Sequence, residues 1–219
     1  MLGLDNAGKT TIVRRLCDKP IDDIEPTLGF SIQTLEYDLP DDADTGDGGA
    51  ASSSTGDGDG HGDGDVGGLA SSSSSSTYQL HLWDIGGQST IRAYWRNYFE
   101  KTDGIVWVVD SGDRSRMGLV REELDLVLQQ ERLEGASLLV LANKSDLDGA
   151  LDPGTVANAL GLNKRQQLQQ TGDDDNGETP NHESRHWTIR ASSAVTGEGL
   201  AESIDWLVRD ITDRIYFAA

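Results

Sequence analysis

The chain has 219 residues, enough for one α/β domain with a sizeable core, and carries a net charge of −20. Most of this charge lies in two segments without Lys or Arg, Asp38–Asp65 with nine Asp and Thr171–Ser184 with five acidic residues. Such acidity argues against nucleic acid as a partner. A single cysteine, Cys17, excludes an internal disulfide, and no apolar run is long enough to cross a membrane. We therefore expect a soluble, cytoplasmic protein.

The first element is a glycine-rich turn that leads into a helix expected at Lys9–Cys17. The eight residues Gly3–Thr10 fit the pattern G-x-x-x-x-G-K-[ST] in full. In this pattern backbone N–H groups face phosphate oxygens, Lys9 reaches the β- and γ-phosphates, and the Thr10 hydroxyl binds Mg²⁺. The helix dipole adds to the attraction. The alternative is a glycine turn before an ordinary helix. The residues expected to contact a nucleotide here are Gly3, Leu4, Asp5, Asn6, Ala7, Gly8, Lys9, Thr10 and Thr11.

Thr27, which follows Pro26, is the next candidate. Its hydroxyl would join the Mg²⁺ ion and its amide the γ-phosphate, but only in the triphosphate state. Taken alone, it is better explained as a turn residue after proline.

Two strand-like stretches, Phe30–Tyr37 and Tyr78–Asp84, flank a segment of Gly, Ser, Asp, Ala and Thr. We expect this insert, residues 41–77, to be disordered at the tip of a β-hairpin, because it lacks the apolar residues needed to offset its ordering entropy. Closing a loop of ~40 rather than ~4 residues costs only about 2 kcal/mol. We expect the acidic insert 171–184 to be disordered for the same reason.

The sequence Asp84-Ile-Gly-Gly-Gln88 stands at the end of the second of these strands. Asp84 can hold Mg²⁺ through water, the amides of Gly86 and Gly87 can meet the γ-phosphate, and Gln88 can orient the attacking water as the catalytic residue. The alternative is a common strand-terminal turn.

Strands and helices alternate in the rest of the chain. Apolar runs typical of buried strands are Ile105–Asp110, Leu138–Ala142 and the shorter Trp187–Arg190. Helical patterns are found at Ile91–Phe99, Met117–Leu133, Gly154–Leu160 and Leu200–Ile215. This alternation predicts a single α/β domain over residues 1–219, with a mainly parallel sheet covered by helices on both faces.

Two further motifs follow apolar strands. Asn143-Lys144-Ser145-Asp146 places Asp146 where it can accept two hydrogen bonds from guanine N1–H and N2–H₂, a pair that adenine does not offer. Backbone amides at Ser193 and Ala194 can meet guanine O6. Ligands bind at the carboxyl ends of strands in open α/β sheets, and all four motifs stand at such ends in one order. Together they predict a protein that binds GTP or GDP with Mg²⁺.

Three stretches resemble the ADP-ribosylation-factor-like (Arf-like) branch of small GTPases: Pro26–Phe30, Trp83–Gln88 and Tyr94–Phe99. Two others, Trp107–Ser111 and Glu131–Ala136, are similar to the Arf-like-two subtype. The resemblance implies a P-loop small G domain with a sheet of about six strands. Because the family places a strand before the phosphate loop, we expect the first strand to be truncated here.

The resemblance also implies a monomeric GTP/GDP switch with slow intrinsic hydrolysis, an activating protein, an exchange factor and effectors. Its subtype is linked to tubulin-folding cofactors, microtubules and lipid-carrier effectors, so the expected localisation is cytoplasmic with microtubule association. Phe30, Trp83 and Tyr98 match the family's aromatic effector surface, although aromatics beside strands are usually core residues. Asp5 matches an acid near the phosphates. The alternatives are a GTP-binding scaffold with little turnover and an Arf-type vesicle-traffic GTPase.

Overall fold

The computed structural model describes residues 1–39, 76–163 and 185–217. Its elements, in chain order, are α1 (Lys9–Leu16), β1 (Phe30–Leu39), β2 (Ser76–Ile85), α2 (Ser89–Arg92), η1 (Trp95–Tyr98), β3 (Gly104–Asp110), η2 (Arg114–Arg116), α3 (Met117–Leu128), η3 (Glu131–Leu133), β4 (Ser137–Asn143), α4 (Pro153–Leu160), β5 (Trp187–Ala191) and α6 (Leu200–Phe217). The η elements are 3₁₀ helices.

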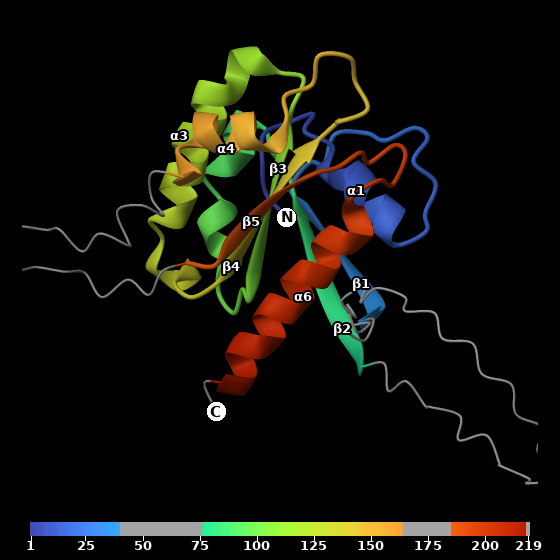
Figure 1. Cartoon of the computed structure of the whole chain (residues 1–219), viewed down its shortest axis with the longest axis vertical. Coiled ribbons are helices and arrows are strands. Elements are labelled where there is room, and N and C mark those ends of the chain that lie inside the picture. The colour runs from blue at the N-terminus through green and yellow to red at the C-terminus, as the bar shows by residue number, and fades with distance from the viewer. Residues whose placement is uncertain (40–75, 164–184, 218–219) are drawn as a thin grey trace, which may run out of the picture.

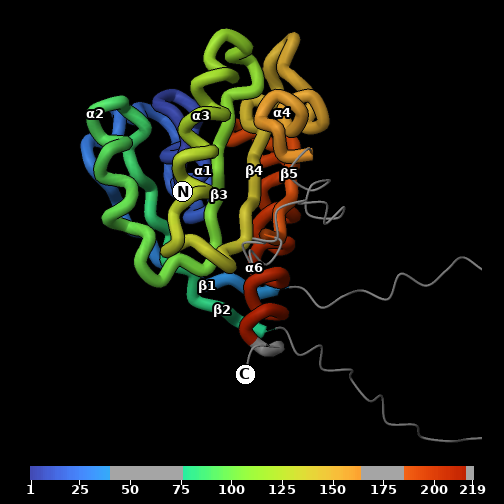
Figure 2. Tube along the Cα trace, turned by 90° about the vertical axis from the view of Figure 1, so that its left-hand side faces the viewer, coloured from blue at the N-terminus to red at the C-terminus, as the bar shows by residue number. Residues whose placement is uncertain are grey.

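The centre of the molecule is a parallel sheet in the order β3-β4-β5 (Figures 1 and 2). Trp107 pairs with Val140, and Val140 pairs with Ile189. All residues of β4 are buried, as expected for a strand with helices on both sides. The predicted α/β architecture is therefore confirmed for the described residues.

Alternate residues of the central strands face opposite layers of helices. Trp107 and Val140 belong to a core shared with α3 and α4. Val108 and Leu141 belong to a second core shared with α1 and α6. Figure 1 shows the same division, with α3 and α4 on one side of the sheet and α1 and α6 on the other. The phosphate loop thus lies where α1 begins beside the strand ends.

Strands β1 and β2 form an antiparallel hairpin, in which Phe30 pairs with Ile85 and Leu39 with Ser76. The segment Met1–Leu2 lies between this hairpin and the central sheet. Leu2 exchanges hydrogen bonds of 2.8 Å with the Val106 carbonyl and the Val108 amide on β3. On its other side, the Met1 carbonyl accepts from the Ile85 amide at 3.4 Å. In this chain the segment contributes one parallel bridge, between Leu2 and Trp107.

A second attachment joins the hairpin to α6. The Tyr37 hydroxyl donates to Asp205 Oδ1 at 2.7 Å and to the Ala201 carbonyl at 3.2 Å. Burial and the neighbouring Asp205 carboxylate raise the pKa of Tyr37, so its hydroxyl stays protonated as a donor.

Four sequence predictions need correction or fall outside the described residues. The helix predicted at Met117–Leu133 ends at Leu128, and Glu131–Leu133 forms the separate element η3. The insert predicted at 41–77 ends too late, because Ser76 and Thr77 belong to β2. The Thr77 hydroxyl donates to Asp38 at 2.6 Å. The remaining residues of that insert, 41–75, fall outside the described residues. The insert predicted at 171–184 does so as well. The helix predicted at Ile91–Phe99 is instead two short pieces, α2 and η1, because Trp95 turns inward to reach the Gly86 carbonyl.

In the part of the chain that the structure describes, no helix combines the length and hydropathy needed to span a bilayer.

Candidate nucleotide-binding site

The phosphate loop is shaped by close backbone approaches that only glycine allows. A Cβ on Gly3, whose φ is +137°, would lie 2.2 Å from the Val108 carbonyl oxygen on β3. A Cβ on Gly8, with φ of +94°, would lie 2.3 Å from the Asn143 side-chain nitrogen. The loop is therefore pressed against the ends of two strands, as the motif predicts.

Lys9 of the same motif is buried. Its ammonium donates to the carbonyls of Gly3 (3.0 Å) and Leu4 (2.8 Å), and the residue is only 6% exposed. Burial lowers the pKa of Lys9 to about 8, against the opposing attraction of Asp84 and Asp5. A buried cation held by neutral carbonyls is well suited to meet the anionic phosphates of a nucleotide.

Three oxygen-bearing side chains from distant segments meet beside Lys9. The Thr10 hydroxyl lies 2.8 Å from the Thr27 hydroxyl and donates to Asp84 Oδ2 at 2.7 Å, while Thr27 donates to the same oxygen at 3.3 Å. The other oxygen, Asp84 Oδ1, is buried and has no hydrogen-bond partner among the described residues. An all-oxygen set with an unsatisfied buried carboxylate oxygen fits Mg²⁺. The three residues predicted to surround the metal are thus brought together.

The segment after Asp84 lies against both the phosphate loop and the Thr27 loop. The Gly86 amide donates to the Gly29 carbonyl at 2.8 Å. A Cβ on Gly87 would lie 2.4 Å from the Asp5 nitrogen, so Gly87 packs directly on the phosphate loop. Gln88 follows and is half-buried.

These segments enclose a cavity of about 380 Å³. Its lining residues are Asp5, Asn6, Gly8, Lys9, Thr10, Thr11, Ile24, Glu25, Pro26, Thr27, Gly86, Gly87 and Gln88. A second hollow of about 580 Å³ shares Thr10, Glu25 and Thr27 with this cavity and is also lined by Asp84. The structure thus gathers most residues of the first three motifs around one space.

The predicted base-binding motifs meet at the other end of the site. Asn143 is fully buried and bridges two segments, because its Nδ2 donates to the Ala7 carbonyl at 2.7 Å and its Oδ1 accepts from the Ala194 amide at 3.0 Å. Asp146 is exposed on the loop that follows, where its carboxylate is free to meet a base. Asn143 therefore links the phosphate loop to the Ser193–Ala194 loop. The two amides predicted to meet guanine O6 have partners within the protein here, since the Ala194 amide donates to Asn143 and the Ser193 amide to the Glu198 carbonyl at 3.0 Å.

Two contacts that sequence reasoning missed hold the base end. Lys144 Nζ lies 2.6 Å from Asp110 Oδ2, which fixes the lysine beside β3. Arg15 of α1 donates from Nε to the Ala194 carbonyl at 3.2 Å and from its guanidinium to the Val195 carbonyl. No short sequence pattern predicts pairs that lie 34 and 179 residues apart.

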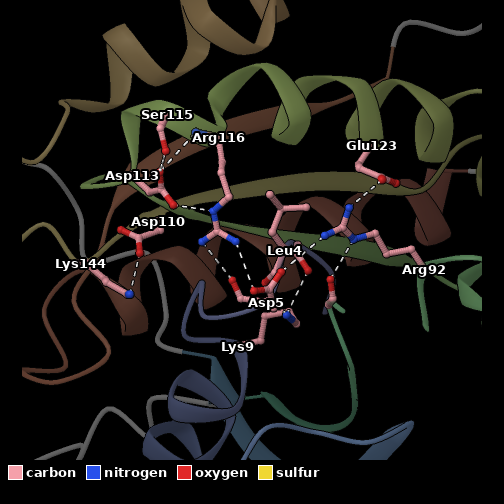
Figure 3. Close-up of polar contacts among 12 residues, drawn as sticks. Leu4, Asp5, Lys9, Arg92, Asp110, Asp113, Ser115, Arg116, Glu123 and Lys144 are labelled. Carbon is pink, nitrogen blue, oxygen red and sulfur yellow. Dashed lines mark hydrogen bonds and ion pairs between the residues drawn. The ribbon is translucent and has the colours of Figure 1, made fainter. Parts of the chain in front are cut away.

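A charged cluster on the phosphate loop was also missed (Figure 3). Asp5 lies 3.5 Å from Arg92 and 3.3 Å from Arg116. Arg116 also pairs with Asp113 at 2.5 Å, and hydrogen bonds from Ser115 and Arg116 lower the pKa of Asp113 to about 2. The acid predicted to lie near the phosphates therefore faces two arginines.

The three aromatic residues predicted as an effector surface pack on one another. The ring centroids of Phe30 and Trp83 lie 5.5 Å apart, and those of Phe30 and Tyr98 lie 4.9 Å apart. Phe30 is 46% exposed and Trp83 is 38% exposed, so the cluster is at the surface, unlike a typical aromatic core. Leu28, two residues before Phe30 in the chain, is 82% exposed.

A phosphate loop, an Mg²⁺-type oxygen set and a guanine-type loop at the strand ends of a parallel sheet define a P-loop GTP-binding protein. The sequence profile of the ADP-ribosylation factor family matches residues 1–41 and 67–211. The chain belongs to the ADP-ribosylation factor family of small GTPases.

Relatives give the same result. ADP-ribosylation factor-like protein 2 of Arabidopsis thaliana is 43% identical over 99% of this chain and 88% of its own length. The protein of the same name from Drosophila melanogaster is 42% identical with the same coverage. ADP-ribosylation factor 1 of Brassica rapa is 36% identical over 94% of this chain and 84% of its own length.

A solved structure is also similar: the Arl6 BBS3 small GTPase from Trypanosoma brucei, with bound nucleotide analogue GppNp, matches with a TM-score of 0.65 and 25% identity. The match covers 97% of this chain and 95% of the other. The chain is thus a small GTPase that binds GTP and GDP with Mg²⁺ and hydrolyses GTP.

Proposed function

We propose that this small GTPase uses Thr27 to sense the γ-phosphate and displays the result on the aromatic surface formed by Phe30, Trp83 and Tyr98. One observation carries this proposal. Thr27 contacts Thr10 and Asp84 in the site, and only three residues later Phe30 stacks on Trp83 at the surface. A phosphate that orders Thr27 therefore orders the aromatic surface as well.

In the proposed reaction the cavity residues divide the work. Lys9 and the phosphate-loop amides neutralise and orient the phosphates, while Thr10, Thr27 and Asp84 hold the metal site. When bound, Mg²⁺ neutralises charge on the phosphate oxygens. Gln88 is the catalytic residue, because it lines the same cavity and can orient the water that attacks the γ-phosphate. Asp146 selects guanine, because its exposed carboxylate can accept hydrogen bonds from N1–H and N2–H₂ of that base.

The catalytic part is tested by hydrolysis of prebound GTP in a single turnover. We expect Gln88→Leu to slow phosphate release with and without an activating protein, while GDP affinity stays unchanged. A Gln88→Leu variant that hydrolyses GTP at the wild-type rate would reject this role and favour a GTP-binding scaffold.

We further propose that the partners are a tubulin-folding cofactor or a lipid-carrier protein, reached in the cytoplasm and on microtubules. The resemblance to the Arf-like-two subtype supports this choice, since relatives of that name are 40–43% identical and the factor 1 relative is 36% identical. A regulator pair, one activating protein and one exchange factor, completes the cycle.

The partner proposal is tested by measuring binding of a purified tubulin cofactor and a purified lipid carrier to the GTP-analogue and GDP forms. We expect binding in the GTP-analogue form alone and its loss in Phe30→Ala. The control Leu126→Ala removes an apolar side chain that is 57% exposed on α3 and should have no effect. Binding to vesicle-coat partners in place of these two would favour the vesicle-traffic alternative.

A further inference from the structure

The Gly86–Gly87 and Gly87–Gln88 peptide units are held by side chains from the segment that follows them. Trp95 Nε1 donates to the Gly86 carbonyl at 2.9 Å, and Arg92 Nε donates to the Gly87 carbonyl at 2.8 Å. A trans peptide is planar, with its C=O and N–H on opposite sides. The Arg92 contact therefore fixes the orientation of the Gly87–Gln88 peptide, and with it the direction in which the Gln88 backbone leaves the phosphate loop.

Arg92 is itself held from two other elements (Figure 3). Its Nη1 lies 2.9 Å from Glu123 Oε1 on α3, and its Nη2 lies 3.5 Å from Asp5 Oδ1 on the phosphate loop. The Arg92 and Glu123 side chains are 12% and 19% exposed, whereas Asp5 is 48% exposed. The short, shielded pair with Glu123 is thus the stronger of the two, because solvent screens the longer Asp5 contact.

Trp95 is buried against Trp107, but packing provides little support for α2 itself. Helix α2 has four residues, Ser89–Arg92, none of them buried, and no side chain caps its N-terminus. Only Ile91 packs partly against the core. The rigid guanidinium of Arg92 therefore binds three groups at once: Glu123 on α3, Asp5 on the phosphate loop and the Gly87 carbonyl. A side chain with a single donor could not hold all three.

We propose that Arg92, oriented by Glu123, is a positioning residue for GTP hydrolysis. It holds the Gly87 carbonyl so that Gln88 stays directed into the phosphate cavity. This inference rests on the proposed catalytic role of Gln88.

The test is single-turnover hydrolysis of GTP prebound with Mg²⁺ by the whole chain, with GDP affinity and thermal unfolding of the GDP form measured alongside. Small displacements of a catalytic group cost up to ~100-fold in rate. We expect Arg92→Ala to slow hydrolysis about 10- to 100-fold, with GDP affinity and the unfolding temperature close to wild type. Arg92→Lys and Glu123→Gln should lie between, because each keeps part of the set of contacts.

Two matched controls separate the effect from simple loss of charge. Arg96→Ala removes an exposed arginine four residues further along, and Glu122→Gln neutralises the exposed neighbour of Glu123. Both should hydrolyse GTP at the wild-type rate. If Arg92→Ala behaves like Arg96→Ala, or if it weakens GDP binding and unfolding temperature as much as hydrolysis, the positioning role is wrong.

A double variant tests the route through Gln88. If Arg92 acts by orienting Gln88, then Gln88→Leu combined with Arg92→Ala should be no slower than Gln88→Leu alone. Additive rate losses would overturn the inference and leave the proposed role of Gln88 intact. A wild-type rate in Gln88→Leu alone would instead reject the proposed catalytic residue, and the two failures are therefore distinguishable.

Discussion

The loops at the base end and at the phosphate end of the nucleotide site differ in how deeply their residues are buried. At the base end Asn143 and Ser193 are fully buried, and Ala194 is 4% exposed. At the phosphate end Gln88 is half-buried, and Thr27 is followed by Leu28 at 82% exposure. Buried, hydrogen-bonded loops open rarely, whereas exposed loops with few apolar contacts order at low cost. The contrast suggests that the base end binds GDP and GTP alike and that the phosphate end distinguishes them.

The largest expected effect breaks the base end at Asn143. Asn143→Ala removes two buried hydrogen bonds and leaves the Ala7 carbonyl and the Ala194 amide without that partner. At about 1–3 kcal/mol for each of the two unsatisfied buried groups, we expect a loss of about 2–6 kcal/mol in the free energy of unfolding. Denaturant titration checks this, and affinities for GDP and GTP should fall together.

Asn158→Ala is the matched control, since Asn158 is exposed on α4 and its side chain accepts from Asn163 at 2.7 Å. It should change stability by less than about 0.5 kcal/mol. A loss in Asn143→Ala confined to GTP would contradict the contrast between the two ends.

The next effect concerns Asp146, which is exposed. Asp146→Asn replaces an acceptor by an amide whose NH₂ opposes the donors of guanine. Loss of two hydrogen bonds to a charged group, at about 1.5 kcal/mol each, predicts about 100-fold weaker binding of both GDP and GTP. Equilibrium titration of each nucleotide measures it, with Asp148→Asn as the exposed control. Unchanged affinity in Asp146→Asn would show that the base is read elsewhere.

A smaller effect should appear at the phosphate end in Thr27→Ala. Removal of a hydroxyl that contacts Thr10 and Asp84 should weaken binding of a GTP analogue about tenfold, equivalent to about 1.4 kcal/mol, and leave GDP binding unchanged. Thr27→Ser keeps the hydroxyl and should restore the difference between the nucleotides. Equal weakening of GDP and the analogue would mean that Thr27 is part of the rigid end.

The smallest expected effect is a pH dependence of nucleotide affinity that comes from Lys9. Burial lowers the pKa of Lys9 from 10.5 to about 8 in the absence of nucleotide. Phosphates favour the charged form, so binding above pH 8 must take up a proton, and affinity should be about fourfold lower at pH 8.5 than at pH 7. The free energy of unfolding without nucleotide changes with pH in the opposite direction. It rises between about pH 8 and 10.5, because the unfolded chain holds this proton more tightly.

Calorimetric titration at pH 8.5 in two buffers of different ionisation enthalpy measures the proton uptake directly. Lys19→Met, which removes an exposed lysine, should leave the uptake unchanged. Absence of proton uptake in the unmodified chain would show that Lys9 is already charged before the nucleotide binds.

Much of the fold followed from periodicity and motif order. The apolar runs at Ile105–Asp110 and Leu138–Ala142 lie within β3 and β4, with one residue more at one or both ends. Prediction was wrong where a tertiary contact overrides a local pattern. The helix expected at Ile91–Phe99 is interrupted because Trp95 turns to donate to the Gly86 carbonyl, a partner nine residues back that helical periodicity does not reveal.

The candidate site shows the same division. The sequence identified Lys9, Thr10, Thr27 and Asp84 by type and spacing, and the structure brings the last three to within 3.3 Å of one another. The aromatic residues could not be assigned to core or surface from the sequence, because both environments use the same residue types. Only the exposure of Phe30 and Trp83 resolved this choice.

By itself, the sequence determined the chemistry of the site, because each motif combines a residue type with a fixed place at the end of a strand or the start of a helix. Tertiary structure alone decided which charges share a neighbourhood. Arg92 meets Glu123 across 31 positions and Asp5 across 87, and Met1–Leu2 joins the hairpin to the central sheet. Long-range pairings of this kind depend on how packed elements approach in space, which no local pattern encodes.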